Sequence, residues 1–407
     1  MTSGPVNPAQ QIARHFMQHD PAKLGVAVSG GSDSTALLML LADRGVADLH
    51  VVTVDHGLRE ESAQEAADVA RLCGRLGLAH DVLRWEGWNG QGNLMAAARA
   101  ARYALLTDWA KANRIADIAL GHTQDDLAET LMMRLRRGAG LDGLSAMAAR
   151  FEQGGVCFHR PLLGATRAQL RHLLQEQGIA WSEDATNSDA RFERARIRSA
   201  MAALELDSET LAETALALRA ARDALEICVA QVADEAVTLD RGDVLIAHDM
   251  LKAQPEEIAR RLMQAALIHV SGAAYGPRGA ELGRLLAGLD RAHTLLGCRI
   301  IPQRGSLRVT REWNAVAGLR ARPGALWDGR WIVAGPAEGR HVAALGEAGL
   351  AHCPDRKASG LPAASLMASP AVWEGERLVA APLAGLEAGY TARNVREWRV
   401  APARMRS

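Results

Sequence analysis

A Ser/Gly-rich hexapeptide, Ser29-Gly30-Gly31-Ser32-Asp33-Ser34, lies between an apolar run at 24–28 and a helical segment at 35–41. Glycines allow a backbone to curl closely around phosphate oxygens. The free N–H groups and the dipole at the start of the following helix attract an anion, and the serine hydroxyls add donors. We interpret the segment as a loop that binds the pyrophosphate part of ATP, which predicts activation of a substrate by adenylation.

This loop differs from the phosphate loop of many nucleotidases, because no Gly-Lys-Ser/Thr follows it. Asp33 is too acidic to contact a phosphate directly. We expect its carboxylate either to hold Mg²⁺ or to cap the backbone. The alternative interpretation of the whole segment is a Ser/Gly turn that only caps a helix.

A second polar segment, 55–59, follows the apolar run at 49–54. Strands of a parallel sheet end at one edge, so Asp55 and His56 are expected beside the phosphate loop. There they could border the adenosine of ATP. The alternative is a polar turn in which Asp55 only caps the backbone.

A third polar segment, 121–130, follows the run at 115–120 and opens a helix. Asp126 and Glu129 lie three residues apart and therefore share a helix face, while His122 lies in the turn. Two acids near ATP suit Mg²⁺ or the binding of an amine. Arg134 and Arg137 lie further along the same helix, where positive side chains interact favourably with the negative end of the helix dipole.

The segment 138–143 matches the dinucleotide pattern G-x-G-x-x-G. That pattern carries a mechanism only where it follows a strand, and here it follows a helix. We interpret it as a flexible loop that faces the substrate.

The elements that position these residues alternate between strand and helix. Strands are expected at 24–28, 49–54, 79–85 and 115–120, and helices at 35–41, 63–76, 94–111 and from about 125. This alternation predicts an α/β domain with a parallel sheet covered on both faces. Residues 200–225 and 255–290 are expected to be helical, and short β-like runs occur at 307–310, 331–334 and 377–381.

Length and composition add limits. A chain of 407 residues with 48% hydrophobic residues predicts two or three domains. The formal net charge is +0, so binding to nucleic acid would require a local basic patch on the surface. Five widely spaced cysteines without a Cys-x-x-Cys pair argue against a zinc ribbon or an iron–sulfur cluster, and no structural metal is expected. Free thiols, no signal peptide and no apolar run long enough for a membrane helix predict a soluble cytoplasmic protein.

In this order, 29–34, 55–59 and 121–130 resemble the N-type ATP pyrophosphatases of the PP-loop superfamily. Within them the chain resembles the tRNA(Ile)-lysidine synthetases, on the segments 93–94, 99–103, 137–144, 160–163 and 181–198. The resemblance is dense over about 20–200, looser over 293–312 and weak in the last eighty or so residues. Met95 stands where the family usually has Glu, and Ala195 where it usually has Asn.

The resemblance implies a catalytic domain at 1–200, a mainly helical linker and tRNA-contact domain at 201–320, and a small β-rich domain at 321–407. It implies catalytic roles for Asp33, Asp126 and Arg137. The residues implied to bind ATP are Ser29, Gly30, Gly31, Ser32, Asp33, Ser34, Asp55, His56 and Gly138. Those implied to bind lysine or Mg²⁺ are His122, Asp125, Asp126 and Glu129. Those expected to bind tRNA are Arg160, Arg191, Arg194 and Arg198, because they belong to a cluster of basic residues that also includes Arg167, Arg171 and Arg196. The alternative for this cluster is a solvated helix face.

The reaction implied by the resemblance joins L-lysine to C2 of the wobble cytidine in the CAU anticodon of tRNA(Ile), with ATP and Mg²⁺ as cofactors. A homodimer and no membrane partner are also expected. The alternatives are a tRNA 2-thiolation enzyme, an amidotransferase-linked synthetase, and a module that binds ATP or tRNA without chemistry. Thiolases of this fold tend to use paired cysteines and an amidotransferase needs a nucleophilic cysteine with a histidine, so the isolated cysteines argue against both.

Overall fold

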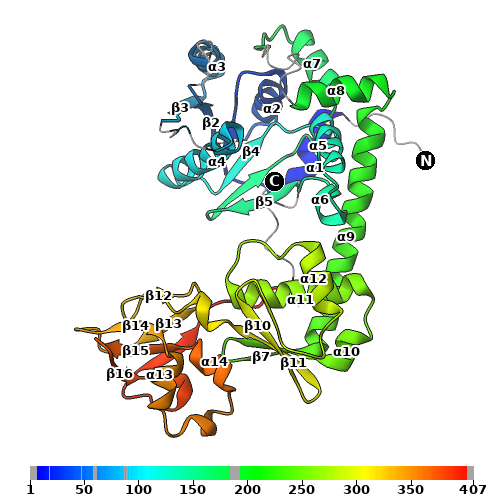
Figure 1. The fold of residues 1–407 in the computed structure, drawn as a ribbon. Coiled ribbons are helices and arrows are strands. Elements are labelled where there is room, and N and C mark those ends of the chain that lie inside the picture. The colour runs from blue at the N-terminus through cyan, green and yellow to red at the C-terminus, as the bar shows by residue number, and fades with distance from the viewer. Residues whose placement is uncertain are drawn as a thin grey trace. The chain divides into compact units, whose positions relative to one another are not determined.

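A computed structural model describes residues 7–400 except 18, 47, 58–61, 87, 89, 91 and 184–192. The chain divides into two compact units, one formed by residues up to Arg222 and the other beginning at Asp223. Each is described by itself (Figure 1). The three predicted domain boundaries remain predictions.

The first unit is an α/β domain, as predicted. Its strands are β1 (Lys23–Ala27), β2 (Asp48–Asp55), β3 (Ala79–Arg84), β4 (Asp117–Leu120), β5 (Arg150–Gln153) and β6 (Val156–His159). Its helices are α1 (Pro8–Phe16), α2 (Ser32–Asp43), α3 (Ser62–Leu76), α4 (Leu94–Ala112), α5 (Gln124–Arg136), α6 (Leu141–Leu144), α7 (Arg167–Glu176), α8 (Glu193–Ala203) and the start of α9 (Ser208–Ala236). The four predicted strands and four predicted helices are all present, with shifted ends.

The six strands form one sheet in the order β3-β2-β1-β4-β6-β5, in which only the edge strand β5 is antiparallel. Successive residues of a strand point to opposite faces. Val26 and Val51 therefore pack with α1, α2, α3 and α7, whereas their neighbours Ala27 and Val52 pack with α4. This double cover explains why the strands are continuous apolar runs.

The chain order places a topological switch beside β1. The strands run from β1 outward through β2 to β3, and the chain then returns to β4 on the other side of β1. In open α/β sheets ligands bind at the carboxyl ends of the strands on either side of such a switch, so the loops after β1 and β4 mark the candidate site, which we call the crevice.

The second unit is mixed. Its strands are β7 (Val237–Asp240), β8 (Asp243–Ala247), β9 (His293–Leu295), β10 (Cys298–Gln303), β11 (Ser306–Arg311), β12 (Leu326–Trp327), β13 (Trp331–Ala334), β14 (His341–Ala344), β15 (Pro370–Glu374), β16 (Arg377–Ala380) and β17 (Thr391–Asn394). Its helices after α9 are α10 (His248–Lys252), α11 (Glu256–Ser271), α12 (Gly279–Leu286), α13 (Gly346–Ala351) and α14 (Ala363–Met367).

An antiparallel five-stranded sheet, β7-β8-β11-β10-β9, shares a core with α11 and α12. It lies within the segment predicted to be mainly helical, and only its strand β11 was anticipated. Two three-stranded sheets, β12-β13-β17 and β14-β15-β16, follow and agree with the predicted β-rich C-terminal region. Among the described helices, none is both long and apolar enough to cross a membrane.

Candidate active site

The phosphate loop connects β1 to α2 as the sequence predicts. Gly30 has φ +87°, a left-handed conformation that favours glycine. The Ser29 amide donates to Ser34 Oγ (3.1 Å), and Ser34 Oγ donates to the Gly31 carbonyl (3.1 Å). These two serines therefore hold the loop in shape. The first N–H groups of α2 have no partner within the helix and are left for an anion.

Two other segments fix this loop from outside. The Ser182 amide donates to the Gly30 carbonyl (2.8 Å), which brings part of the 181–198 motif to the phosphate loop. A Cβ on Gly121 would lie 2.9 Å from Ser34 Cα, closer than real Cβ contacts come. The loop after β4 thus touches the loop after β1, and only glycine allows this approach.

Arg167, the first residue of α7, links three carboxylates at this crevice. Its Nε donates to Asp33 Oδ2 (3.1 Å), and its Nη1 donates to Glu129 Oε1 (3.3 Å). Its Nη2 forms an ion pair with Asp126 Oδ1 (3.7 Å). The acidic residues after β4 and the aspartate of the phosphate loop therefore converge on one guanidinium group.

Helix α8 supplies two more cations to the same carboxylates. Arg194 Nη1 donates to Asp126 Oδ1 (3.3 Å), and Arg198 Nε donates to Glu129 Oε1 (2.5 Å). Asp126 Oδ2 also accepts from the Thr123 amide (2.9 Å) and so caps α5. Glu129 Oε2 is buried and accepts no hydrogen bond from the described residues.

Burial sets the protonation states at this crevice. It raises the pKa of Asp33, against the opposing effect of Arg167. It also lowers the pKa of His122 to about 3, so this imidazole is neutral at neutral pH. For Asp126, burial acts to raise the pKa, but the neighbouring His122, then Arg194, the Thr123 amide and Arg167, bring it below its usual value. Shifted pKa values of several ionisable groups within one site are typical of a functional site.

Several predicted site residues lie elsewhere or serve the scaffold. Arg137 caps the far end of α5, about 16 Å along the helix from Asp126, and its exposed guanidinium donates to Glu193 Oε2 (2.6 Å). Gly138 follows it with φ +68°. The structure therefore does not bring Arg137 and Gly138 to Asp33 and Asp126, and their predicted roles remain predictions.

Asp125 accepts one hydrogen bond from a backbone amide and one from a serine hydroxyl, and both donors lie at helix starts. Its Oδ2 accepts from the Arg167 amide (2.7 Å) and its Oδ1 from Ser208 Oγ (3.1 Å), so it joins the starts of α7 and α9. Asp55 caps its own turn through the Gly57 amide (2.8 Å), which is the first cause of its lowered pKa. His56 packs edge-on against Trp85.

The predicted tRNA-binding arginines differ in exposure. Arg160 is only 1% exposed, donates to the Ala148 carbonyl (2.7 Å) and stacks on Phe151. In that position its guanidinium supports the interior of the domain. Arg194 and Arg198 remain partly exposed, and Arg191 lies outside the described residues.

Sequence reasoning missed the central position of Arg167, which it grouped with the RNA-binding residues. The signal was weak, because Arg167 follows Thr166 at an ordinary helix start with a Thr166–Gln169 capping box. Arg102 was also missed as a site residue. Burial lowers its pKa, and it lies close enough to Asp126 to act on it electrostatically. Of the family departures, Met95 is 61% exposed and Ala195 is 6% exposed.

The fold and this crevice define a nucleotide-cleaving domain of the PP-loop class, and residues 6–205 match the family model described as a PP-loop domain. The chain is 49% identical over 397 residues to the tRNA(Ile)-lysidine synthase of Ruegeria pomeroyi, covering 94% of this chain and 95% of that protein. The chain belongs to the tRNA(Ile)-lysidine synthase family.

Other relatives extend the comparison. The tRNA(Ile)-lysidine synthase of Bradyrhizobium diazoefficiens is 43% identical over 289 residues, covering 66% of this chain and 78% of that protein. Among solved structures, the U34-tRNA thiolase NcsA from Methanococcus maripaludis is 16% identical with a TM-score of 0.44, covering 51% of this chain and 76% of that one.

Proposed function

We propose that this chain joins L-lysine to C2 of the wobble cytidine in the CAU anticodon of tRNA(Ile), forming lysidine. The observation that carries the proposal is the 49% identity to a tRNA(Ile)-lysidine synthase across nearly the whole length of both chains. In the first step the C2 oxygen of cytidine attacks the α-phosphorus of ATP and pyrophosphate leaves. In the second, the lysine ε-amine attacks C2 and AMP leaves.

The first step needs stabilisation of a departing pyrophosphate. The phosphate loop, whose conformation Ser29 and Ser34 hold by hydrogen bonds, and the start of α2 would supply backbone N–H groups to the pyrophosphate. Asp33 and Asp126 fit Mg²⁺, which takes one or two carboxylates together with phosphate oxygens and water. When bound, Mg²⁺ supplies positive charge to the phosphates. Glu129 Oε2 is buried, accepts no hydrogen bond from the described residues and lies 3.7 Å from Arg194 Nε, so it offers a further ligand oxygen for a cation at this site.

The second step needs a neutral amine, because an ammonium group has no lone pair for attack. Asp126 has a lowered pKa and is therefore ionised at neutral pH. We propose that Asp126, with Glu129 beside it, orients the lysine ammonium and takes its proton.

The proposed RNA contacts are Arg194 and Arg198 of α8, together with Arg191, which lies outside the described residues. The guanidinium groups of Arg194 and Arg198 pair with the carboxylates and are partly exposed to solvent. Phosphate contacts there would make tRNA affinity fall as salt rises. Cytoplasmic location and a homodimer remain predictions from the sequence.

A single-turnover assay tests the proposal. The full chain is incubated with unmodified tRNA(Ile), ATP, Mg²⁺ and L-lysine, while AMP and pyrophosphate are measured and the tRNA nucleosides are analysed by mass spectrometry. Lysine-dependent formation of lysidine is the expected result. Folded protein that releases no AMP or pyrophosphate with lysine present would refute it.

The same assay distinguishes lysidine formation from the alternative reaction, 2-thiolation, in which a sulfur donor replaces lysine. The five cysteines, all within the described part of the chain, are free, and Cys73, Cys298 and Cys353 are buried. Burial raises the pKa of Cys73 to about 11 and that of Cys298 to about 12, which disfavours the reactive thiolates. A thiolated nucleoside in place of lysidine would favour the alternative.

We predict that Asp126→Asn slows lysine transfer by about a hundredfold, the lower range for loss of a general base. An amide keeps one oxygen for the Thr123 amide but carries no charge for an ammonium group. Transfer is measured from isolated adenylated tRNA, so that the first step does not mask the second. Asp108→Asn, the same change at an exposed position of α4, is the control. Equal transfer rates in both variants would retire Asp126 as the partner of the amine.

A further inference from the structure

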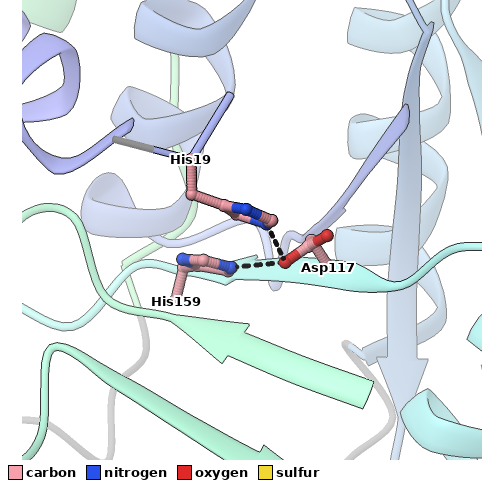
Figure 2. A group of neighbouring side chains, drawn as sticks. All are labelled: His19, Asp117 and His159. Carbon is pink, nitrogen blue, oxygen red and sulfur yellow. Dashed lines mark hydrogen bonds and ion pairs between the residues drawn. The ribbon is translucent and has the colours of Figure 1, made fainter. Parts of the chain in front are cut away.

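A second group of ionisable side chains lies in the same unit on another part of the sheet. His19 Nε2 and His159 Nε2 both meet Asp117 Oδ1, at 3.0 and 2.8 Å (Figure 2). One potential ligand atom from each residue lies within 4.8 Å of the others. The three residues come from the segment after α1, from β4 and from β6, so the fold assembles them from distant parts of the sequence.

This cluster is separate from the ATP crevice. Asp117 is the first residue of β4, whereas Gly121 follows the end of that strand. Four residues of extended chain span about 13 Å. None of the chemistry proposed above uses His19, Asp117 or His159.

We propose that His19, Asp117 and His159 bind one transition-metal ion of the Zn²⁺ type. Each imidazole would contribute Nε2 and the aspartate one carboxylate oxygen. Zn²⁺ bonds of about 2.0 Å in a tetrahedron separate neighbouring donor atoms by roughly 3.3 Å. The present contacts of 2.8 and 3.0 Å differ from this by only a few tenths of an ångström.

The proton positions on the two histidines are compatible with the binding of a metal ion in place of the present hydrogen bonds. Both Nε2 atoms now face one carboxylate oxygen, so each must carry a proton in the metal-free protein. A metal ion bound at each Nε2 would require the other tautomer, in which each neutral imidazole carries its one proton on Nδ1. His159 Nδ1 lies 2.9 Å from His15 Nε2, and in this tautomer it would donate there, with the proton of neutral His15 on its own Nδ1. Such an outer partner fixes the orientation of a metal-binding histidine.

The donor set selects the class of metal. Mg²⁺ and Ca²⁺ prefer oxygen ligands, whereas two imidazoles with one carboxylate suit Zn²⁺ and its neighbours. Arg150 donates to Cys157 Sγ (2.8 Å), and Cys157 pairs with Asp117 across the sheet. This cation opposes the binding of any metal ion, so the affinity has to come from direct bonds to the two imidazoles and the carboxylate.

Exposure provides a route for the ion. The side chain of His19 is 43% exposed, whereas those of His159 and Asp117 are 2% and 7% exposed. The fourth coordination position would therefore be open to water on the His19 side. Bound metal would tie the segment after α1 to β4 and β6, and it would stabilise the folded state by mass action.

The competing explanation is a metal-free hydrogen-bonded network that only holds α1 on the sheet. Cobalt(II) separates the two explanations, because tetrahedral Co²⁺ gives strong visible bands and octahedral Co²⁺ gives weak ones. The full chain is stripped with a chelator and titrated with Co²⁺, and Zn²⁺ is then used to displace it. The expected result is one equivalent with a tetrahedral spectrum, displaced by Zn²⁺, and a higher unfolding temperature with metal.

Two variants of the exposed ligand sharpen the test. His19→Ala is expected to weaken binding at least about a hundredfold, since it removes one of three ligands. His19→Cys is expected to keep binding and add a thiolate-to-cobalt absorption band, which only direct ligation produces. His172→Ala is the control, because His172 is an exposed histidine on α7 whose partner is Glu176.

Three results would overturn the proposal. They are an octahedral spectrum in the unsubstituted protein, equal Co²⁺ affinity in His19→Ala and His172→Ala, and no new band in a folded His19→Cys protein that binds Co²⁺. Circular dichroism of each variant checks folding, and the half-exposed position of His19 makes both substitutions there mild.

Discussion

Asp33→Ala is expected to abolish detectable adenylation of tRNA(Ile) while tRNA binding persists. The carboxylate lies in the first turn of α2, next to the loop proposed to hold pyrophosphate. Removing a group that stabilises charge in a transition state costs at least about a hundredfold in rate. Pyrophosphate release in a single turnover measures the first step, and a filter-binding assay measures tRNA affinity.

The stability of this variant gives an independent check. Burial raises the pKa of Asp33, so the folded protein holds its ionised form at some cost at neutral pH. The substitution removes this cost, and Arg167 keeps Asp126 and Glu129 as partners. We therefore expect an unfolding temperature close to that of the unsubstituted protein, which would mark Asp33 as a residue kept for function.

Asp43→Ala is the matched control, because it removes an exposed aspartate from the other end of the same helix. It should leave adenylation unchanged. Adenylation retained in Asp33→Ala would contradict the proposed role. Loss of adenylation accompanied by loss of tRNA binding would show instead that the substitution disturbs the whole crevice.

The catalytic fold could be predicted because its signals are local. Continuous apolar runs such as 24–28 and 49–54 require burial on both faces, and the intervening helices have their own periodicity. The antiparallel pair β5 and β6 escaped prediction because polar residues interrupt both short segments, which read Arg-Phe-Glu-Gln and Val-Cys-Phe-His. The sheet formed by β7 to β11 escaped because its pairing joins β8 to β11, which lie some sixty residues apart in sequence.

Only those residues of the candidate site that directly follow a strand could be predicted from the sequence. The order of strands places the loops after β1 and β4 together, so Ser34 and Gly121 meet as expected. Arg167 starts a helix well beyond these strands, and no spacing rule connects it to Asp33. Arg137 lies at the far end of α5, where its side chain pairs with Glu193, and its predicted catalytic role remains a prediction.

The loss of Arg167 is expected to have the second large effect, on stability as well as activity. Its guanidinium touches Asp33, Asp126 and Glu129, whose side chains are 18%, 7% and 2% exposed. Arg167→Ala leaves these carboxylates with fewer counter-charges. Breaking a buried ion pair from one side costs about 3–5 kcal/mol, and Arg194 and Arg198 should keep the loss near the lower value. Urea unfolding at neutral pH measures it.

The pH dependence of this loss identifies its cause. Arg167 acts to lower the pKa of Asp33, so its removal raises that pKa further above the unfolded value. The folded variant then binds more protons than its unfolded chain, and its stability falls as pH rises from about 4 through the folded pKa. The difference in unfolding free energy between the unsubstituted protein and Arg167→Ala should therefore be larger at pH 7 than at pH 4.

Two further variants separate charge from geometry. Arg167→Lys keeps the charge but cannot direct a planar fork of donors at three carboxylates, so we expect partial recovery of stability and little recovery of adenylation. Arg171→Ala lies one turn further along α7, where the side chain is 42% exposed and pairs with exposed Glu183. It should change stability by less than about 0.5 kcal/mol. A loss in Arg167→Ala that is no larger than in Arg171→Ala, or that is equal at pH 4 and pH 7, would show that Arg167 does not hold the three carboxylates together.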